Sequence, residues 1–215
     1  KTDKRPQLSW PNNMTGADVI RFMIKKASKT SNGVDMQNGM NYPQLISKYT
    51  MGAVLYHQAC DNYLDEKMTS SVKPNNKPYK KGAYYTGKEH SWDEAFGYWG
   101  AAAHTMTLSA QQSYDVAKKK DLKSADFNKD GIIDLYKEMT YGHAYYASAF
   151  DRAGKTNYLK NVTGAFIEGR KIITGANGER LSSNDLTKVQ DLAQVICSNW
   201  AQVIAEAVFK YAGSV

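Results

Sequence analysis

The chain has 215 residues, enough for one domain or two small ones, and 42% of them are hydrophobic and 23% charged. This composition is typical of a globular protein and excludes intrinsic disorder, a collagen-like chain and a small disulfide-dense scaffold. The net charge is +7, but the lysines are scattered and no zinc-finger, basic-zipper or RNA-recognition pattern is present, so we expect no nucleic-acid partner. No apolar run reaches the roughly 18 residues of a transmembrane helix, so we expect no transmembrane segment.

The beginning of the chain indicates either processing or truncation. Its first residue is Lys1 rather than Met, which indicates that a targeting segment has been removed or that the sequence is a fragment. Residues 1–13 are polar and contain proline, so we expect an extended arm there. A single helical domain is expected over residues 14–215.

Apolar residues recur at spacings of three and four along most of the chain, and no convincing alternating run of β-branched residues is present. Capping and turn residues divide this pattern into about six helices, which predicts an all-α helical bundle. Ser91 and Glu94 match the S-x-x-E capping box, so the third helix is expected to begin at Ser91 and to run to about Lys119. The expected helices span about 15–26, 43–68, 91–119, 134–152, 157–174 and 183–211.

Two cysteines, Cys60 and Cys197, fall in the second and last of these helices. A disulfide between them would close a long loop and stabilise the fold by about 4 kcal/mol or more in the chain-entropy model. The alternative is two separate buried thiols, because free cysteine packs as a small hydrophobic residue. Export from the cell would favour the disulfide.

The segment Gly87–Tyr98 combines an imidazole with carboxylates. If a helix begins at Ser91, His90 lies at its entry, and Asp93 and Glu94 follow on the same side. Such a set is suited to binding a transition metal such as Fe or Zn, or to acting as a general acid–base pair. The alternative is that Glu94 only completes the capping box and His90 precedes the cap.

Residues 126–134 read D-x-N-x-D-G-x-I-D, the first part of an EF-hand-type calcium loop. In such a loop alternate oxygens converge on one hard cation, Gly131 permits the sharp turn, and Ile133 is expected to anchor the loop in the core. The usual twelfth position holds Lys137, which cannot ligate a cation, so the next residue is expected to take that role. The sequence therefore predicts a structural Ca²⁺ site in loop 126–138, with ligands Asp126, Asn128, Asp130, Ile132, Asp134 and Glu138. The alternative is a surface turn capped by its own Asp and Asn side chains.

Three of these features together resemble a known family. They are the string Glu89–Tyr98, which contains WDEAFGY, the loop Asp126–Asp134, and a long terminal helix containing Trp200. They are similar to a branch of the imelysin-like proteins, known mainly as a bacterial domain of unknown function. The resemblance implies an exported all-helical protein, periplasmic, extracellular or associated with the cell surface, and linked to iron acquisition.

Catalysis is not supported by the motifs present. The peptidase label of that family rests on a G-x-H-x-x-E motif, but here Gly87 lies one residue further from His90 and Asp93 stands in place of the Glu. No HExxH, G-x-S-x-G or phosphate-binding glycine loop is found, so no catalytic residue is assigned.

The expected function is an exported, calcium-stabilised helical binding protein, metal- or iron-associated by the resemblance. The alternative is an extracellular structural module that self-assembles, as a homo-oligomer, without catalytic activity.

Overall fold

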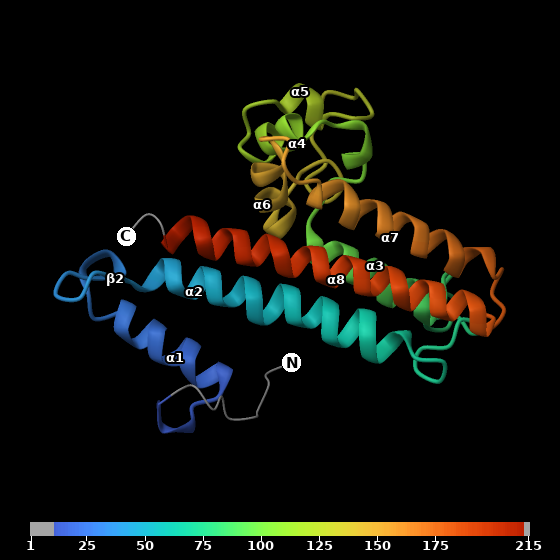
Figure 1. Cartoon of the computed structure of the whole chain (residues 1–215), viewed down its shortest axis with the longest axis horizontal. Helices are drawn as coiled ribbons and strands as arrows, with labels where there is room; N and C mark the ends of the chain where they lie inside the picture. The colour runs from blue at the N-terminus through green and yellow to red at the C-terminus, as the bar shows by residue number, and fades with distance from the viewer. Residues whose placement is uncertain (1–10, 213–215) are drawn as a thin grey trace. The chain divides into compact units, whose positions relative to one another are not determined.

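The computed structural model describes residues 11–212, and these residues are predominantly helical (Figure 1). They contain eight α-helices and one short antiparallel strand pair, so the all-α fold is confirmed. The arm expected over residues 1–13 lies mostly outside the described residues, and Pro11–Asn13 forms a 3₁₀ turn. The bounds are α1 Gly16–Ala27, β1 Val34–Asp35, β2 Met40–Asn41, α2 Tyr42–Thr50, α3 Gly87–Trp99, α4 Ala110–Ala117, α5 Leu122–Ala125, α6 Gly142–Asp151, α7 Tyr158–Gly175 and α8 Ser183–Ala212.

The chain divides into two compact units, Lys1–Leu55 and Tyr56–Val215. Whether these units make up the single helical domain expected over residues 14–215 stays a prediction. Both candidate functional regions, loop 126–138 and the His90 segment, belong to the second unit.

The first unit is built around α1, whose start follows from its capping residues. The Thr15 hydroxyl accepts a hydrogen bond from the backbone N–H of Asp18 (3.3 Å), and the Asp18 carboxylate accepts one from the backbone N–H of Thr15 (3.1 Å). Val19 and Met23 lie one turn apart on α1 and pack with Tyr42 into a small apolar core. The predicted first helix is therefore confirmed, with Thr15 as its cap.

A continuous helical segment runs from Tyr42 to Met68, as the sequence predicts. Pro43 lies in its first turn, where proline is tolerated because no helical N–H is required there. Beyond α2 the segment continues as the π-helical η3 (Met51–Tyr56) and η4 (Gln58–Asp65) and the 3₁₀ turn η5 (Glu66–Met68). The sequence does not predict these π-helical turns, because a spacing of three and four between apolar residues does not distinguish them from α-helical turns.

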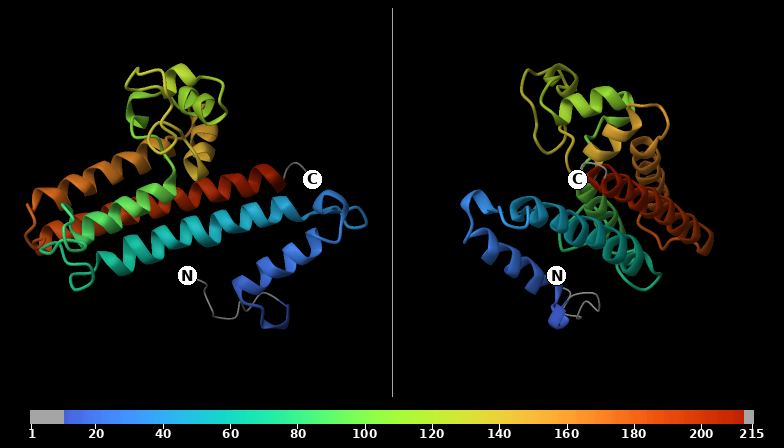
Figure 2. Two further views of the ribbon diagram at one scale, coloured as in Figure 1. Left: turned by 180° about the vertical axis from the view of Figure 1, so that it is seen from behind. Right: turned by 60° about the vertical axis from the view of Figure 1, so that its left-hand side comes forward.

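In the second unit, α7 packs against both α3 and α8, and η4 also packs against α3 and α8 (Figures 1 and 2). The inner face of α8 carries Val189, Ala193, Ile196, Trp200 and Val203, all buried and spaced by three or four residues as a helix face requires. By length and composition alone, α8 is long and apolar enough to cross a membrane. The expected absence of a transmembrane segment therefore stays a prediction.

The expected third helix has the wrong start and the wrong end. It begins at Gly87, because Thr86 and Glu89 form an earlier capping box in which the Glu89 carboxylate accepts from the backbone N–H of Thr86 (2.7 Å). It ends at Trp99, because Gly100 takes a left-handed conformation with φ of 84°. A Cβ at Gly100 would lie 2.8 Å from a backbone oxygen, so glycine is required for both the turn and the close approach. The rest of the expected helix is a loop with the 3₁₀ turn η6 (Thr105–Thr107), followed by the separate α4.

The expected fourth helix begins later than predicted, at Gly142 rather than at Asp134. The intervening residues are the end of loop 126–138, which closes in a turn over 135–138, and three residues without regular secondary structure. They are fixed by main-chain bonds to the end of α3, from the N–H of Tyr141 to the Gly100 carbonyl (2.7 Å) and from the N–H of Ala103 to the Lys137 carbonyl (2.7 Å). These long-range bonds compete with the helix that the sequence alone favours. The fifth and sixth predicted helices correspond to α7 and α8.

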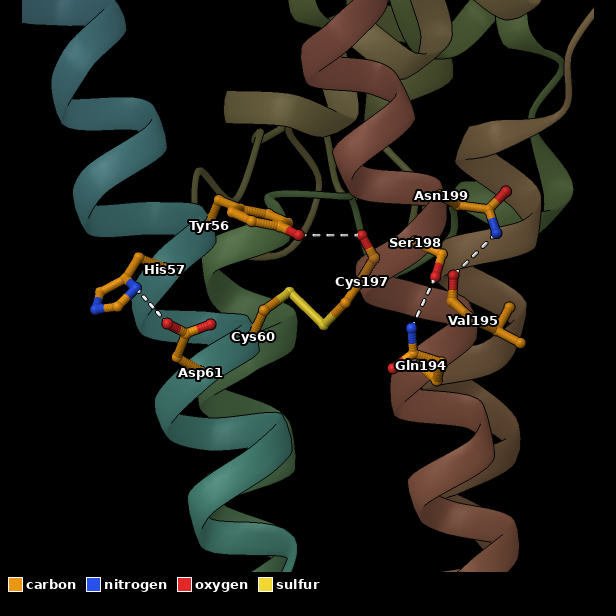
Figure 3. Close-up of a disulfide and its surroundings, with 9 residues drawn as sticks. All are labelled: Tyr56, His57, Cys60, Asp61, Gln194, Val195, Cys197, Ser198 and Asn199. Carbon is orange, nitrogen blue, oxygen red and sulfur yellow. Dashed lines mark hydrogen bonds and ion pairs between the residues drawn. A yellow bond between two sulfur atoms is a disulfide. The ribbon is translucent and has the colours of Figure 1, made fainter. Parts of the chain in front are cut away.

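Cys60 of η4 and Cys197 of α8 are joined by a disulfide, with their Cα atoms 5.8 Å apart (Figure 3). The Tyr56 hydroxyl donates to the backbone carbonyl of Cys197 (3.4 Å) beside it. Of the two alternatives that the sequence leaves open, the structure has the disulfide. The bridge fixes the register of η4 against α8.

Candidate functional site

The loop that begins at Asp126 is folded by its own polar side chains. One Asp126 oxygen accepts from the N–H of Gly131 (3.0 Å), the Asn128 amide oxygen accepts from the N–H of Asp130 (3.0 Å), and Asp130 accepts from the N–H of Ile132 (2.8 Å). Gly131 has φ of 81°, the left-handed conformation that its place in the motif requires. The side chains of Asp126, Asn128 and Asp130, the first three predicted ligands, thus bond to backbone N–H groups two to five residues later in the same loop.

Glu138, the last residue of loop 126–138, is only 5% exposed. One of its carboxylate oxygens accepts from the N–H groups of Phe127 (3.0 Å) and Asn128 (3.4 Å), and the other accepts from the N–H of Asp134 (2.9 Å). The residue predicted as a bidentate ligand therefore holds the start and the end of the loop together. Because a carboxylate has about four acceptor positions, these three bonds do not exhaust it.

Asp134 is placed at the edge of the loop. One carboxylate oxygen accepts from the N–H of Tyr136 (2.8 Å) and the other pairs with the Lys137 ammonium (3.3 Å). The backbone N–H of Tyr136, and then Lys137, hold the pKa of Asp134 below its ordinary value. Asp134 therefore stays ionised at neutral pH, as a cation ligand must.

The loop is anchored to a small apolar core. Ile133 packs against a buried cluster as the sequence predicts, and the ring of Phe127 stacks on His104 with centroids 5.0 Å apart. His104 in turn has Nε2 2.9 Å from the Ser124 carbonyl. These contacts fix the position of both ends of the loop without using the charged side chains. The cluster consists of Leu108, Val116, Ala125 and Met139.

The chemistry of the loop fits a hard cation, although its carboxylates are not gathered at one point. Asp126 Oδ1 is buried and has no hydrogen-bond partner among residues 11–212, a costly state for a carboxylate oxygen. In the same residues, no three His, Cys, Asp or Glu side chains form a group that could hold a metal ion. A Ca²⁺ site in this loop would also use the Asn128 amide and the Ile132 carbonyl, which are oxygen donors of the kind that Ca²⁺ prefers.

The second candidate region lies on α3, where Glu89 is buried and paired. Its carboxylate accepts from Arg170 of α7 (2.7 Å) and from the Thr174 hydroxyl (3.0 Å), in addition to the backbone of Thr86. Burial alone would raise the pKa of Glu89, but the Thr86 N–H, Thr174 and Arg170 together hold it below its ordinary value. No motif in the sequence indicates a role for Glu89 or Arg170.

Asp93 pairs with the same guanidinium, through Arg170 Nε at 2.8 Å. Burial raises the pKa of Asp93, and Arg170 opposes this effect only in part. His90 Nε2 lies 3.4 Å from Glu94, and its ring stacks on Tyr79 with centroids 3.7 Å apart. His90, Asp93 and Glu94 thus occupy one surface of α3, within the helix rather than at its entry.

These three side chains border a shallow hollow of about 430 Å³, together with Gly97 and Tyr98. The structure brings the predicted residues together, but Asp93 faces Arg170, so His90 and Glu94 form a pair rather than a three-ligand set. Among residues 11–212 no group of three His, Cys, Asp or Glu side chains that could hold a metal is found, and an Fe or Zn site at these residues stays a prediction.

A larger cavity of about 630 Å³ opens between α3 and α7 and shares Asp93 with the hollow. Its walls are formed by Trp92, Phe96, Phe166 and Ile167, and its mouth by polar residues that include Arg170. The sequence pattern does not predict this cavity. Beside it, α7 approaches α3 so closely at Gly169 that a Cβ there would overlap the Trp92 ring. The glycine inside a predicted helix was the available signal.

A family model described as Domain of unknown function (DUF4856) matches residues 23–211. No curated protein and no solved structure matches the chain.

Proposed function

The chain belongs to the DUF4856 family, and from this premise we propose that it is an exported, helical binding protein that Ca²⁺ stabilises. In this proposal loop 126–138 binds a structural Ca²⁺ ion, and the cavity between α3 and α7 receives the ligand. Neither role requires catalysis. The likeness of Glu89–Tyr98 and of the loop to imelysin-like proteins supports export. The disulfide between Cys60 and Cys197 supports it too, because such bonds persist in oxidising compartments.

The observation that carries the calcium proposal is the buried Asp126 oxygen without a hydrogen-bond partner among residues 11–212. It lies in a loop whose other oxygens occupy the spacing of a calcium site. A divalent ion would satisfy that oxygen and offset the repulsion between neighbouring carboxylates. With Lys137 at the usual twelfth position, we expect weak binding, with Kd on the order of 10⁻⁵ to 10⁻³ M.

Calorimetric titration and thermal unfolding test this proposal. When free Ca²⁺ is about 100 times Kd, it should stabilise the protein by about 2.7 kcal/mol, and a chelator should remove that gain. Asp130→Asn should abolish the Ca²⁺-dependent shift in Tm. Asp191→Asn, an exposed acid on α8, serves as the matched control and should keep it. Identical melting curves for the unaltered protein in Ca²⁺ and in chelator would refute the calcium site.

The binding role rests on the cavity between α3 and α7. Sites for small molecules are typically concave and mostly apolar, with a few polar groups at fixed positions and ionisable groups whose pKa values are shifted. Trp92, Phe96 and Phe166 supply the apolar walls, while Asp93 and Arg170 supply the polar edge. Iron and zinc are not part of this proposal, because Asp93 is held by Arg170.

A second candidate, self-assembly into a homo-oligomer, is favoured by the outer surface of the calcium loop. Ile132, Leu135 and Tyr136 are 72%, 62% and 99% exposed, an unusual concentration of apolar side chains in one loop. Sedimentation velocity over a range of protein concentrations, with and without Ca²⁺, tests this alternative. A monomer at every concentration would exclude it, whereas oligomers lost in Ile132→Ser would support it.

A further inference from the structure

The polar groups around the cavity between α3 and α7 are already bonded to one another. The Trp92 indole N–H donates to the backbone carbonyl of Phe166 (2.8 Å), which leaves only its ring to line the wall. Arg170 is held by Glu89 at 2.7 Å and by Asp93 at 2.8 Å. The guanidinium is therefore fixed against two carboxylates at the mouth.

The remaining charge at the mouth is also paired. Lys171 Nζ lies 3.5 Å from the Glu168 carboxylate, one turn back on α7. An anionic ligand that approached Arg170 would also approach the two carboxylates that hold it. A cationic ligand that approached Asp93 would meet Arg170 and Lys171, both of which line the cavity. Neither sign of charge finds an unpaired partner.

We propose that this cavity binds an uncharged, largely apolar small molecule, an inference that rests on the binding role proposed above and names its ligand class. The volume of about 630 Å³ lies within the range of about 300–1,000 Å³ that such sites occupy. A single hydrogen-bonding group on the ligand can meet the amide of Asn177, which lines the mouth.

The wall geometry favours a ligand that contains a ring. Phe166 packs edge-to-face against Trp92 and Phe96, with centroids 5.7 and 5.4 Å apart. A ligand with an aromatic or cyclic apolar ring can pack against these rings without breaking an ion pair. Trp92 and Phe166 are only 1% and 2% exposed, so close packing holds these two rings in place.

Two fluorescent probes that differ by one charge test the ligand class directly. N-phenyl-1-naphthylamine is neutral, and 8-anilinonaphthalene-1-sulfonate has the same ring system with an added sulfonate. We expect saturable binding of one neutral probe per chain, sensitised by tryptophan fluorescence, and a Kd at least about tenfold lower than that of the sulfonate.

Two variants test whether the probe binds in the cavity. Ile167→Asp puts a charge on the wall at a partly exposed position, and Ala103→Trp fills the space from an exposed position, so both should fold. Each should raise the Kd of the neutral probe by about tenfold or more. Val195→Asp makes the same kind of change on an exposed part of α8 and should leave the Kd unchanged. The Ca²⁺-dependent shift in Tm, measured on every variant, reports that the fold and the loop are intact.

The outcomes separate the ligand class from the proposed function. Tighter binding of the neutral probe, weakened by Ile167→Asp and Ala103→Trp, supports the inference. Equal or tighter binding of the sulfonate, also weakened by these variants, keeps the cavity as a binding site but overturns the ligand class. Binding of neither probe, or binding that both variants leave unchanged, overturns the inference as a whole. The calcium proposal is judged independently by the Tm shift.

Discussion

Loop 126–138 and the cavity between α3 and α7 are built in opposite ways. The loop takes nearly all of its polar residues from one continuous stretch, and its side chains bond to backbone groups two to eleven residues away. The cavity is formed by helices whose facing residues, Trp92 and Phe166, are 74 positions apart. The loop is charged and largely exposed, whereas the cavity is apolar and its ionic groups neutralise one another at the mouth.

This difference determines how each site depends on the rest of the fold. The loop should respond chiefly to changes in its own carboxylates and to Ca²⁺. The cavity should respond to anything that alters how α7 packs on α3. The following experiments either separate the two regions or show that they are not separate.

The largest effect is expected from Trp92→Ala. Trp92 is fully buried, packs on Phe166 and fills the space beside Gly169, so its removal leaves a large void and removes the hydrogen bond to the Phe166 carbonyl. We expect a loss of about 3–5 kcal/mol in the free energy of unfolding, measured by denaturant titration. Tyr84→Ala, at a fully exposed aromatic residue, should change it by less than about 0.5 kcal/mol. A loss below about 1 kcal/mol for Trp92→Ala would mean that the two helices do not pack as described.

Replacing both disulfide cysteines comes next. The Cys60→Ser, Cys197→Ser protein loses a bridge that spans 137 positions, and its free energy of unfolding should fall by about 2–5 kcal/mol. Thiol labelling of the unaltered protein provides the control, since it should take up label only after reduction. If the double variant is as stable as the parent, the bridge does not constrain the chain.

Arg170→Met should have an intermediate effect. The change leaves the buried Glu89 carboxylate without its cation and should destabilise the protein by about 2 kcal/mol at neutral pH. Arg21→Met removes an exposed pair with Asp18 and should cost less than about 1 kcal/mol. Equal effects of the two changes would show that the α3–α7 ion pair is no stronger than a surface one.

The Arg170→Met substitution should also change how the stability of the protein depends on pH. The pKa of Glu89 is lowered from its ordinary value of 4.5, so its ionised form stabilises the fold above that pH. This stabilisation is lost as the pH falls from 4.5 through the lower pKa of the folded protein. In Arg170→Met the loss of stability over that acidic range should be smaller, as measured by thermal unfolding in a series of buffers. If Arg170→Met leaves the dependence of stability on acidic pH unchanged, that dependence arises from groups other than Glu89.

A smaller effect is expected from Glu138→Gln, which preserves shape but replaces one acceptor oxygen by an amide that cannot accept. The N–H groups of Phe127 and Asp134 can no longer both be satisfied, so we expect a loss of about 1 kcal/mol without Ca²⁺. The affinity for Ca²⁺ should fall as well, by calorimetry. Lys137→Gln, its exposed neighbour, should change stability by no more than about 0.5 kcal/mol.

The smallest expected effect is the coupling between the regions. Asp130 bonds within its loop and Ile167 lies on α7, so they share no hydrogen-bond partner. The stability changes of Asp130→Asn and Ile167→Asp should therefore add to within about 0.5 kcal/mol. A coupling above about 1 kcal/mol would show that the main-chain bond between Ala103 and Lys137 transmits strain from one site to the other.

Local signals in the sequence predicted the parts of the fold that depend on local chemistry. The first helix begins where the sequence predicts it, with Thr15 as its cap, and Ile133 anchors its loop as expected. The start of α3 was wrong because two capping boxes lie close together, and tertiary contacts choose between them. The Thr86 hydroxyl donates to the buried Asn75 (2.7 Å), which favours the earlier box. Ser91 instead bonds back to the Gly87 carbonyl inside the helix.

The cavity could not be predicted in the same way, because no short motif encodes it. Its lining residues look like ordinary core positions of two amphipathic helices. They become a candidate site only in the folded protein. There α7 approaches α3 at Gly169, and Arg170 pairs with Glu89 and Asp93. Such features arise from packing between distant segments, which periodicity and spacing do not report.

The disulfide gives the second unit a topological property. Cys60 and Cys197 close a covalent ring that contains residues 61–196, and both loop 126–138 and the walls of the cavity lie inside it. A single protease cut in any surface turn of that ring opens the polypeptide without releasing a fragment. The nicked protein remains one molecule on a non-reducing gel and separates into pieces only when a reductant is added.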